Sequence, residues 1–119
     1  MTRLDAVRER YMQDGLEIRL GGLAANLARL ASFSSRLKNH RSVEYLLEES
    51  KWFIEWMVPD ASPEMQAELA DLQIQLAVWH RAWQQGKLEG GRLDEMIAQA
   101  HAWSDRLLER SGLLKTDAP

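Results

Sequence analysis

Cysteine is absent from this chain of 119 residues, and its absence excludes several classes of protein. Disulfide-stabilised folds, cysteine-based zinc sites, iron–sulfur clusters and thiol nucleophiles all require it. Long apolar runs are also missing, because none approaches the ~20 residues that a membrane-spanning helix needs. The first residues, Met1 to Asp5, mix charges and lead into no apolar segment, so we expect no signal peptide. The expected protein is cytoplasmic and makes no use of the membrane.

Positive charge is also scarce, since Lys and Arg number 15 against 18 Asp and Glu, for a net charge of −3. A protein that binds duplex DNA usually carries a basic excess on one face, so the composition argues against a nucleic-acid partner. One basic cluster, Arg36 to Arg41, ends a predicted helix. Cations at that position complement the negative end of the helix dipole, and we prefer this structural role to an anion or RNA site.

Apolar residues make up 45% of the chain and recur at intervals of three and four, which predicts helices rather than strands. The pattern continues through four segments that are separated by breaks at Asn39-His40-Arg41, at Pro59 and at Gly86 to Gly91. Short connections of this kind join antiparallel neighbours. The sequence therefore predicts an all-α fold, an antiparallel up-down four-helix bundle that spans residues 1–112 as a single domain, followed by a tail at 113–119.

The first predicted helix is long, from Asp5 to Asn39, with a bend allowed at Gly21-Gly22. Each glycine inside a helix costs ~1 kcal/mol relative to Ala. A length of ~50 Å, at 1.5 Å per residue, would extend well beyond the other helices. A separate short N-terminal helix is the alternative, because one apolar stripe falls out of phase at Asp14-Gly15. This stripe consists of Leu4, Val7 and Tyr11.

The later helices have clear boundary residues. The second helix is predicted from Val43 to Met57. The third begins after Ser62, a suitable N-cap, with Pro63 at the first helical position, where its missing N–H costs nothing. Gly86 and Gly112 are suited to the left-handed conformation that ends a helix, and they mark the ends of the third and fourth helices.

Recognisable metal and catalytic motifs are missing as well. A di-iron bundle needs Glu-x-x-His pairs on facing helices, but no histidine of this chain follows a Glu at that spacing. His101 and Asp105 lie four residues apart and supply at most two ligands, so we predict no metal and no cofactor. Glu49 lies among aromatic residues, where desolvation would raise its pKa, but a hydrogen bond to Trp or Arg explains its position equally well. We therefore predict no catalytic residue and no enzyme.

Tryptophan, in contrast, is abundant, with five in the chain. Trp79 and Trp83 lie on the inward stripe of the third helix and are predicted core residues. The second helix has an inward face and, in addition, an aromatic face formed by Tyr45, Glu49, Trp52 and Trp56. A helix that is apolar on two sides has more apolar surface than one neighbouring helix can cover. Trp and Tyr are residues that anchor interfaces. We predict that the aromatic face is an interaction surface unless the first helix wraps it.

Small residues form the second unusual feature. They lie on the first predicted helix, at spacings that would let another helix backbone approach closely, and they are Gly21, Gly22, Ala25 and Ala28. The approaching helix belongs either to the same chain, as ordinary close packing, or to a second copy, as a dimer contact. The sequence favours neither reading over the other.

These features together favour a non-enzymatic helical interaction module with an adaptor or regulatory role. A homodimer would cover the overhanging first helix and the aromatic face with one self-complementary patch. We therefore expect the chain to bind itself, with another protein as a further candidate partner. The alternative is a binder of a small apolar ligand or pigment, held between the helices by the tryptophans. An open bundle interior would favour the ligand binder, and a closed core would favour the interaction module.

Overall fold

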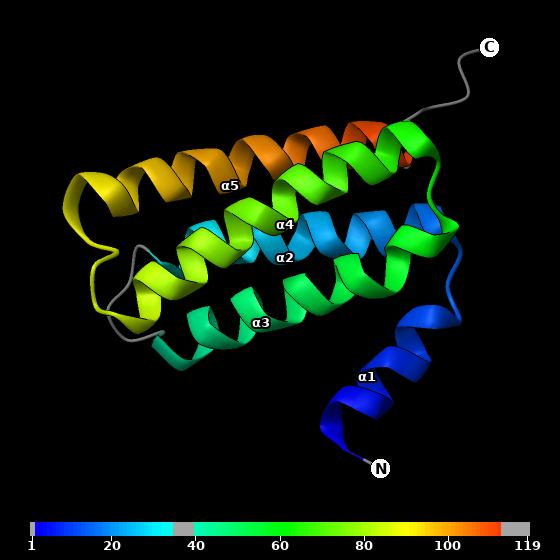
Figure 1. Cartoon of the computed structure of the whole chain (residues 1–119), viewed down its shortest axis with the longest axis horizontal. Helices are drawn as coiled ribbons and strands as arrows, with labels where there is room; N and C mark the ends of the chain where they lie inside the picture. The colour runs from blue at the N-terminus through cyan, green and yellow to red at the C-terminus, as the bar shows by residue number, and fades with distance from the viewer. Residues whose placement is uncertain (1, 35–39, 113–119) are drawn as a thin grey trace.

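The computed structural model describes residues 2–34 and 40–112, in which five α-helices and one short 3₁₀ helix are found. Four long helices run alongside one another, each opposite in direction to the one before it, and a short N-terminal helix lies against the second of the four (Figure 1). The elements are α1 (Arg3–Met12), α2 (Leu16–Ser34), α3 (His40–Met57), η2 (Val58–Asp60), α4 (Pro63–Gln84) and α5 (Gly90–Ser111). The all-α prediction is confirmed. The predicted four-helix bundle is not confirmed, because the described residues form five helices.

The predicted single helix from Asp5 to Asn39 is wrong, because the chain leaves the helical path at residues 13–15. The N–H groups of Gln13 and Asp14 both bond at 3.3 Å to carbonyls in the last turn of α1, and the carbonyl of Gly15 accepts the first hydrogen bond of α2. The break lies where the apolar stripe changes phase. It turns α1 back against α3 in place of an overhang, and Gly21-Gly22 lie within an uninterrupted α2.

The predicted boundary residues of α4 and α5 are confirmed. The hydroxyl of Ser62 accepts the N–H of Met65 at 3.2 Å, which caps the start of α4. Gly86 has a φ of 70°, and its N–H donates to the carbonyl of Trp83 at 3.1 Å in the turn that follows α4. Gly112 has a φ of 78° and ends α5. Both glycines adopt a conformation that side chains disfavour, which explains their positions.

The connection between α2 and α3 falls on residues 35–39, outside the described residues, as do the tail at 113–119 and most of the basic cluster Arg36 to Arg41. α3 begins at His40, three residues before the predicted Val43. His40 and Arg41 therefore belong to the helix and not to the predicted break. The predicted end of this helix at Met57 is confirmed.

α2 forms the centre of the apolar core, with α3 on one side and α5 on the other. The innermost side chains come from all four long helices and include Leu23, Leu27, Leu47, Ile54, Leu72 and Leu107. The Ser104 hydroxyl of α5 donates to the carbonyl of Ala24 at 2.7 Å, so the two helices approach closely. The small buried side chains of Ala24 and Ala31 permit this approach. Trp79 is buried as predicted, and Trp83 is half-buried against the same core.

Replacing Trp79 by Glu should unfold the protein. The Trp79 side chain is 4% exposed, and an unpaired charge at that depth costs about 3–5 kcal/mol, out of a total stability of about 5–15 kcal/mol for a typical domain. Thermal unfolding followed by circular dichroism measures the effect. The control is Ala98→Glu, which places the same charge on an exposed position of α5. Equal melting temperatures for the two variants would contradict the placement of Trp79 in the core.

Candidate functional site

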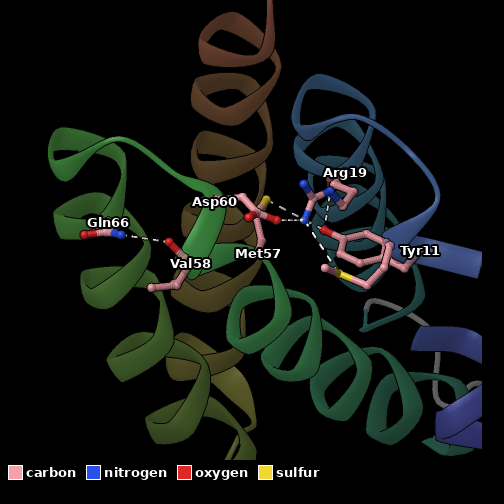
Figure 2. Close-up of polar contacts among 7 residues, drawn as sticks. Tyr11, Arg19, Met57, Val58, Asp60 and Gln66 are labelled. Carbon is pink, nitrogen blue, oxygen red and sulfur yellow. Dashed lines mark hydrogen bonds and ion pairs between the residues drawn. The ribbon is translucent and has the colours of Figure 1, made fainter. Parts of the chain in front are cut away.

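Tyr11 joins three helices at the N-terminal side of the molecule. Its ring stacks on Phe53 of α3, with 3.9 Å between ring centroids and 8° between planes. Its hydroxyl donates to the backbone carbonyl of Arg19 in α2 at 2.8 Å (Figure 2). The ring also rests on α2 at Gly22, where a Cβ would lie 3.7 Å from Tyr11 Cε1. The last turn of α1 is therefore fixed to both α2 and α3 by one buried side chain.

Arg19 lies next to this contact and is 6% exposed. Its Nη1 donates to Asp60 Oδ2 at 2.9 Å and lies 3.6 Å from the sulfur of Met12 (Figure 2). Asp60 belongs to η2, where the Val58 carbonyl accepts a hydrogen bond from Gln66 Nε2 at 2.8 Å. A buried cation thus ties the break after α1 to the connection between α3 and α4. Removing the carboxylate would leave that charge uncompensated, which proteins tolerate poorly.

α1 covers one half of the aromatic face and leaves the other half at the surface. Trp56 is 9% exposed, with its ring 6.1 Å from that of Tyr11, and belongs to the core. Of the two alternatives left open by the sequence, the wrapping of the aromatic face by the N-terminal segment therefore holds for Trp56, because the chain break lets α1 fold over it. Trp52 stacks on Trp56 at 5.9 Å between centroids but remains 40% exposed.

Trp52 stands between two surface hollows. The first, of about 310 Å³, lies between α1 and α3 and is lined by Thr2, Leu4, Asp5, Arg8, Trp52 and Trp56. The second, of about 250 Å³, lies between α3 and α4 and is lined by Glu48, Lys51, Trp52, Glu55 and Gln73. The exposed indole is thus flanked by depressions whose rims carry charges of both signs.

Tyr45 and Glu49 are held in place by polar contacts. The Arg3 guanidinium lies over the Tyr45 ring, 4.4 Å from its centroid. Tyr45 donates a hydrogen bond to Glu49. This bond is the main cause that raises the pKa of Tyr45, and partial burial is the second cause. Glu49 also accepts from Asn26 Nδ2 at 3.1 Å, and Asn26 Oδ1 accepts from Arg29 Nη2 at 2.6 Å. Glu49 therefore holds Tyr45 and Asn26 in place through hydrogen bonds.

A second polar group, missed by the sequence analysis, lies between α3 and α4. His80 is buried, with Nε2 2.6 Å from Glu44 Oε1 and Nδ1 3.4 Å from Lys51 Nζ. Gln84 Nε2 donates to the same Glu44 oxygen at 3.2 Å. Both ring nitrogens are within reach of a neighbouring side chain, which fits a structural link between helices. A polar stripe on each helix could have indicated this group in the sequence. Glu44 and Lys51 lie seven residues apart on α3, and His80 and Gln84 lie four residues apart on α4.

The remaining sequence-predicted residues do not come together into one site. Gly22 contacts α1 through Tyr11, whereas Gly21, Ala25 and Ala28 are half-buried along α2. His101 and Asp105 are both exposed, and the described ranges contain no group of three or more side chains that could hold a metal ion. None of the helices within residues 2–34 and 40–112 combines the length and the apolarity required to cross a membrane.

Comparison of the chain with known protein families, with curated proteins and with solved structures gives no match. The site is therefore interpreted from its geometry and chemistry.

Replacing Tyr11 by Phe should reduce the loss of stability at alkaline pH. Burial raises the pKa of Tyr11 well above its ordinary value of 10.0. The phenol stays protonated in the folded protein and ionises near that value in the unfolded chain. Its contribution is therefore complete below about pH 10 and falls above it, by about 1.4 kcal/mol per pH unit. At neutral pH the variant should lose only about 0.5–1.5 kcal/mol, for one hydrogen bond.

Denaturant unfolding from neutral pH to about pH 11, past the ordinary tyrosine pKa, measures this difference. Tyr45 is present in both proteins, so any dependence that it causes is common to both. Parallel stability curves for the wild type and Tyr11→Phe would show that Tyr11 titrates alike in the folded and unfolded states.

Trp56→Glu and Trp52→Glu should differ in their effect on stability. The first buries a carboxylate beneath α1 and should cost several kcal/mol. The second changes a side chain that is already 40% exposed and should cost less, namely the lost ring stacking of about 0.5–1.5 kcal/mol and the burial of the covered part of one indole. Chemical denaturation of both variants tests this order. A Trp56→Glu protein as stable as the wild type would mean that α1 does not cover Trp56 in solution.

Proposed function

We propose that this protein is a non-enzymatic helical interaction module with an adaptor or regulatory role. In this proposal α2 to α5 act as an up-down bundle that serves as a rigid scaffold, and another protein binds at the exposed part of the aromatic face. The observation that carries the proposal is the exposure of Trp52. Its large indole is 40% exposed, although the neighbouring Trp56 is covered.

The surroundings of Trp52 suit the binding of a protein segment. Trp and Tyr are the residues most enriched at energetically dominant interface positions. Tyr45, Glu49 and Trp52 lie on one side of α3, at spacings of four and three residues. Ring stacking and hydrogen bonds already hold all three in place, so little side-chain freedom is lost on binding. The two hollows beside Trp52 fit apolar anchors of a partner whose flanking residues carry both signs of charge.

The alternative, a small apolar ligand between the helices, has less support. Such a ligand needs space among the tryptophans and leucines of the interior. The leucines that face one another there are fully buried, and Trp79 fills its position in the core. A core whose leucines are shielded from solvent supports an interaction module over a ligand binder.

The homodimer is part of the proposal as well, on a surface other than the aromatic face. Because α1 folds over Trp56, the chain itself covers much of the surface that a second copy was expected to cover. The exposed part of the aromatic face is therefore left for a different protein. A second copy fits better at α4.

A photo-crosslinking amino acid at position 55, which is exposed on α3 and lines the second hollow beside Trp52, tests the interaction module and leaves Trp52 in place. In extracts of the source cells, position 55 should capture a distinct protein that the exposed control position 98, on α5, does not capture. Unlabelled wild-type protein should compete for this capture, and a folded Trp52→Glu variant should compete at least tenfold less well. The same captured proteins at both positions, or equal competition by Trp52→Glu, would count against the aromatic face as the binding surface.

A further inference from the structure

The outward side of α4 carries an apolar stripe at the surface. Ile74 is 66% exposed and Val78 is 57% exposed, and these are the two most exposed large apolar side chains among the described residues. Three more exposed apolar residues lie on the same helix, namely Ala67, Ala70 and Ala77. β-Branched residues are poorer helix formers than Ala. Local helix formation therefore gives no reason for Ile and Val at these positions.

The opposite side of α4 is fully occupied by the core, so the stripe cannot turn inward. Leu72 and Leu76 are 0% exposed and face the other helices, together with Trp79. In Figure 1, α4 crosses in front of α2, with α3 and α5 on its two sides. No segment within residues 2–34 and 40–112 covers Ile74 and Val78, so this side of α4 is open to a second molecule.

Two charged residues flank the apolar pair, and their arrangement is symmetric in the sequence. Ile74 and Val78 lie two residues before and after position 76, and Asp71 and Arg81 lie five residues before and after it. Both charged residues are exposed, and neither forms a side-chain ion pair with another described residue. If a second copy of α4 lies antiparallel to the first and is centred on the same position 76, the apolar residues of the two helices face each other. Each Asp71 then faces an Arg81 of the other copy.

The spacing of these residues is that of a helix–helix seam. Positions 67, 71, 74, 78, 81 and 85 alternate by four and three, the pattern that lines one side of paired helices. In an antiparallel pair about position 76, Ile74 meets Val78 of the second copy and Asp71 meets Arg81 of the second copy. A parallel pair would instead set Asp71 against Asp71 and Arg81 against Arg81, and like charges in such positions repel.

We infer that α4 is the self-association surface of this protein, and that two copies pair antiparallel about position 76. The pair has an apolar centre of Ile74 and Val78, closed at each end by an Asp71–Arg81 ion pair. This inference rests on the homodimer included in the proposed function and assigns its surface. The contact is two-fold and self-complementary, so it closes at two copies. One helix from each copy makes a small interface, and the dimer dissociates in the micromolar range.

Sedimentation equilibrium of the wild type and of α4 variants tests this surface. Ile74→Glu should weaken association at least tenfold while its helical signal stays unchanged, because position 74 is exposed. Asp71→Arg and Arg81→Asp should each weaken association at low salt, and the double variant should recover it. Trp52→Glu is the matched control and should leave the dimer intact.

The possible results separate this inference from the proposed function. A dimer that Trp52→Glu dissociates and Ile74→Glu does not would overturn the α4 surface and leave the homodimer standing. A wild type that stays monomeric at high micromolar concentration would overturn both, while the crosslinking at position 55 still tests the binding of another protein. Charge swaps without recovery in the double variant would overturn the antiparallel register.

The absence of cysteine allows a direct test of the register with single cysteines. In the antiparallel pair, Ala67 of one copy lies opposite Gln85 of the other, whereas the two copies of position 67 lie about 27 Å apart, at 1.5 Å per residue. A short thiol crosslinker should therefore join Ala67→Cys to Gln85→Cys in a mixture and should join neither variant to itself. Efficient self-crosslinking of Ala67→Cys would show a parallel pair and overturn the proposed geometry.

Discussion

The insertion of Tyr11 between α2 and α3 is the contact on which the N-terminal half of the structure depends. A phenol suits this position because its ring stacks on Phe53 while its hydroxyl supplies a donor to the Arg19 carbonyl within a buried site. The position of Tyr11 sets the direction of α1, and α1 in turn covers Trp56. Trp52, one turn earlier on α3, is left at the edge of that cover. The exposed part of the aromatic face is thus a consequence of where one aromatic ring is buried.

The sequence predicts the helices well where their boundary signals are local. Ser62 and Pro63 start α4, and Gly86 and Gly112 follow α4 and α5, because each acts on the backbone of its own turn. The break at residues 13–15 has no comparable signal. It contains no proline, and Gly15 is not among the glycines with positive φ. The buried contact of Tyr11 fixes α1 after the break, and the traces of the break in the sequence are the Asp14-Gly15 pair and the change of phase in the apolar stripe.

The sequence predicts which helix carries the aromatic face, but it does not predict how much of that face α1 covers. The two-sided apolar pattern of α3 predicts that something covers Trp52 and Trp56, but it does not say how far a covering helix reaches. The contact of His80 with Glu44 depends on the register of α4 against α3, which neither stripe specifies alone. Ile74 and Val78 lie off the inward stripe of α4, and that departure was visible in the sequence. Only the exposed fractions of Ile74 and Val78 in the structure show that both side chains lie at the surface.

The shortness of α1 has a thermodynamic consequence. It has ten residues, and isolated helices shorter than about 12–15 residues are barely stable in water. Its capping box, formed by Thr2 and Asp5, satisfies the first turn but adds no length. The helix therefore depends on its contacts with α2 and α3, and we expect its ordering and the covering of Trp56 to be one cooperative event. We expect this local unit to open at a lower free energy than the whole protein, so that hydrogen exchange in α1 reports how often Trp56 meets solvent.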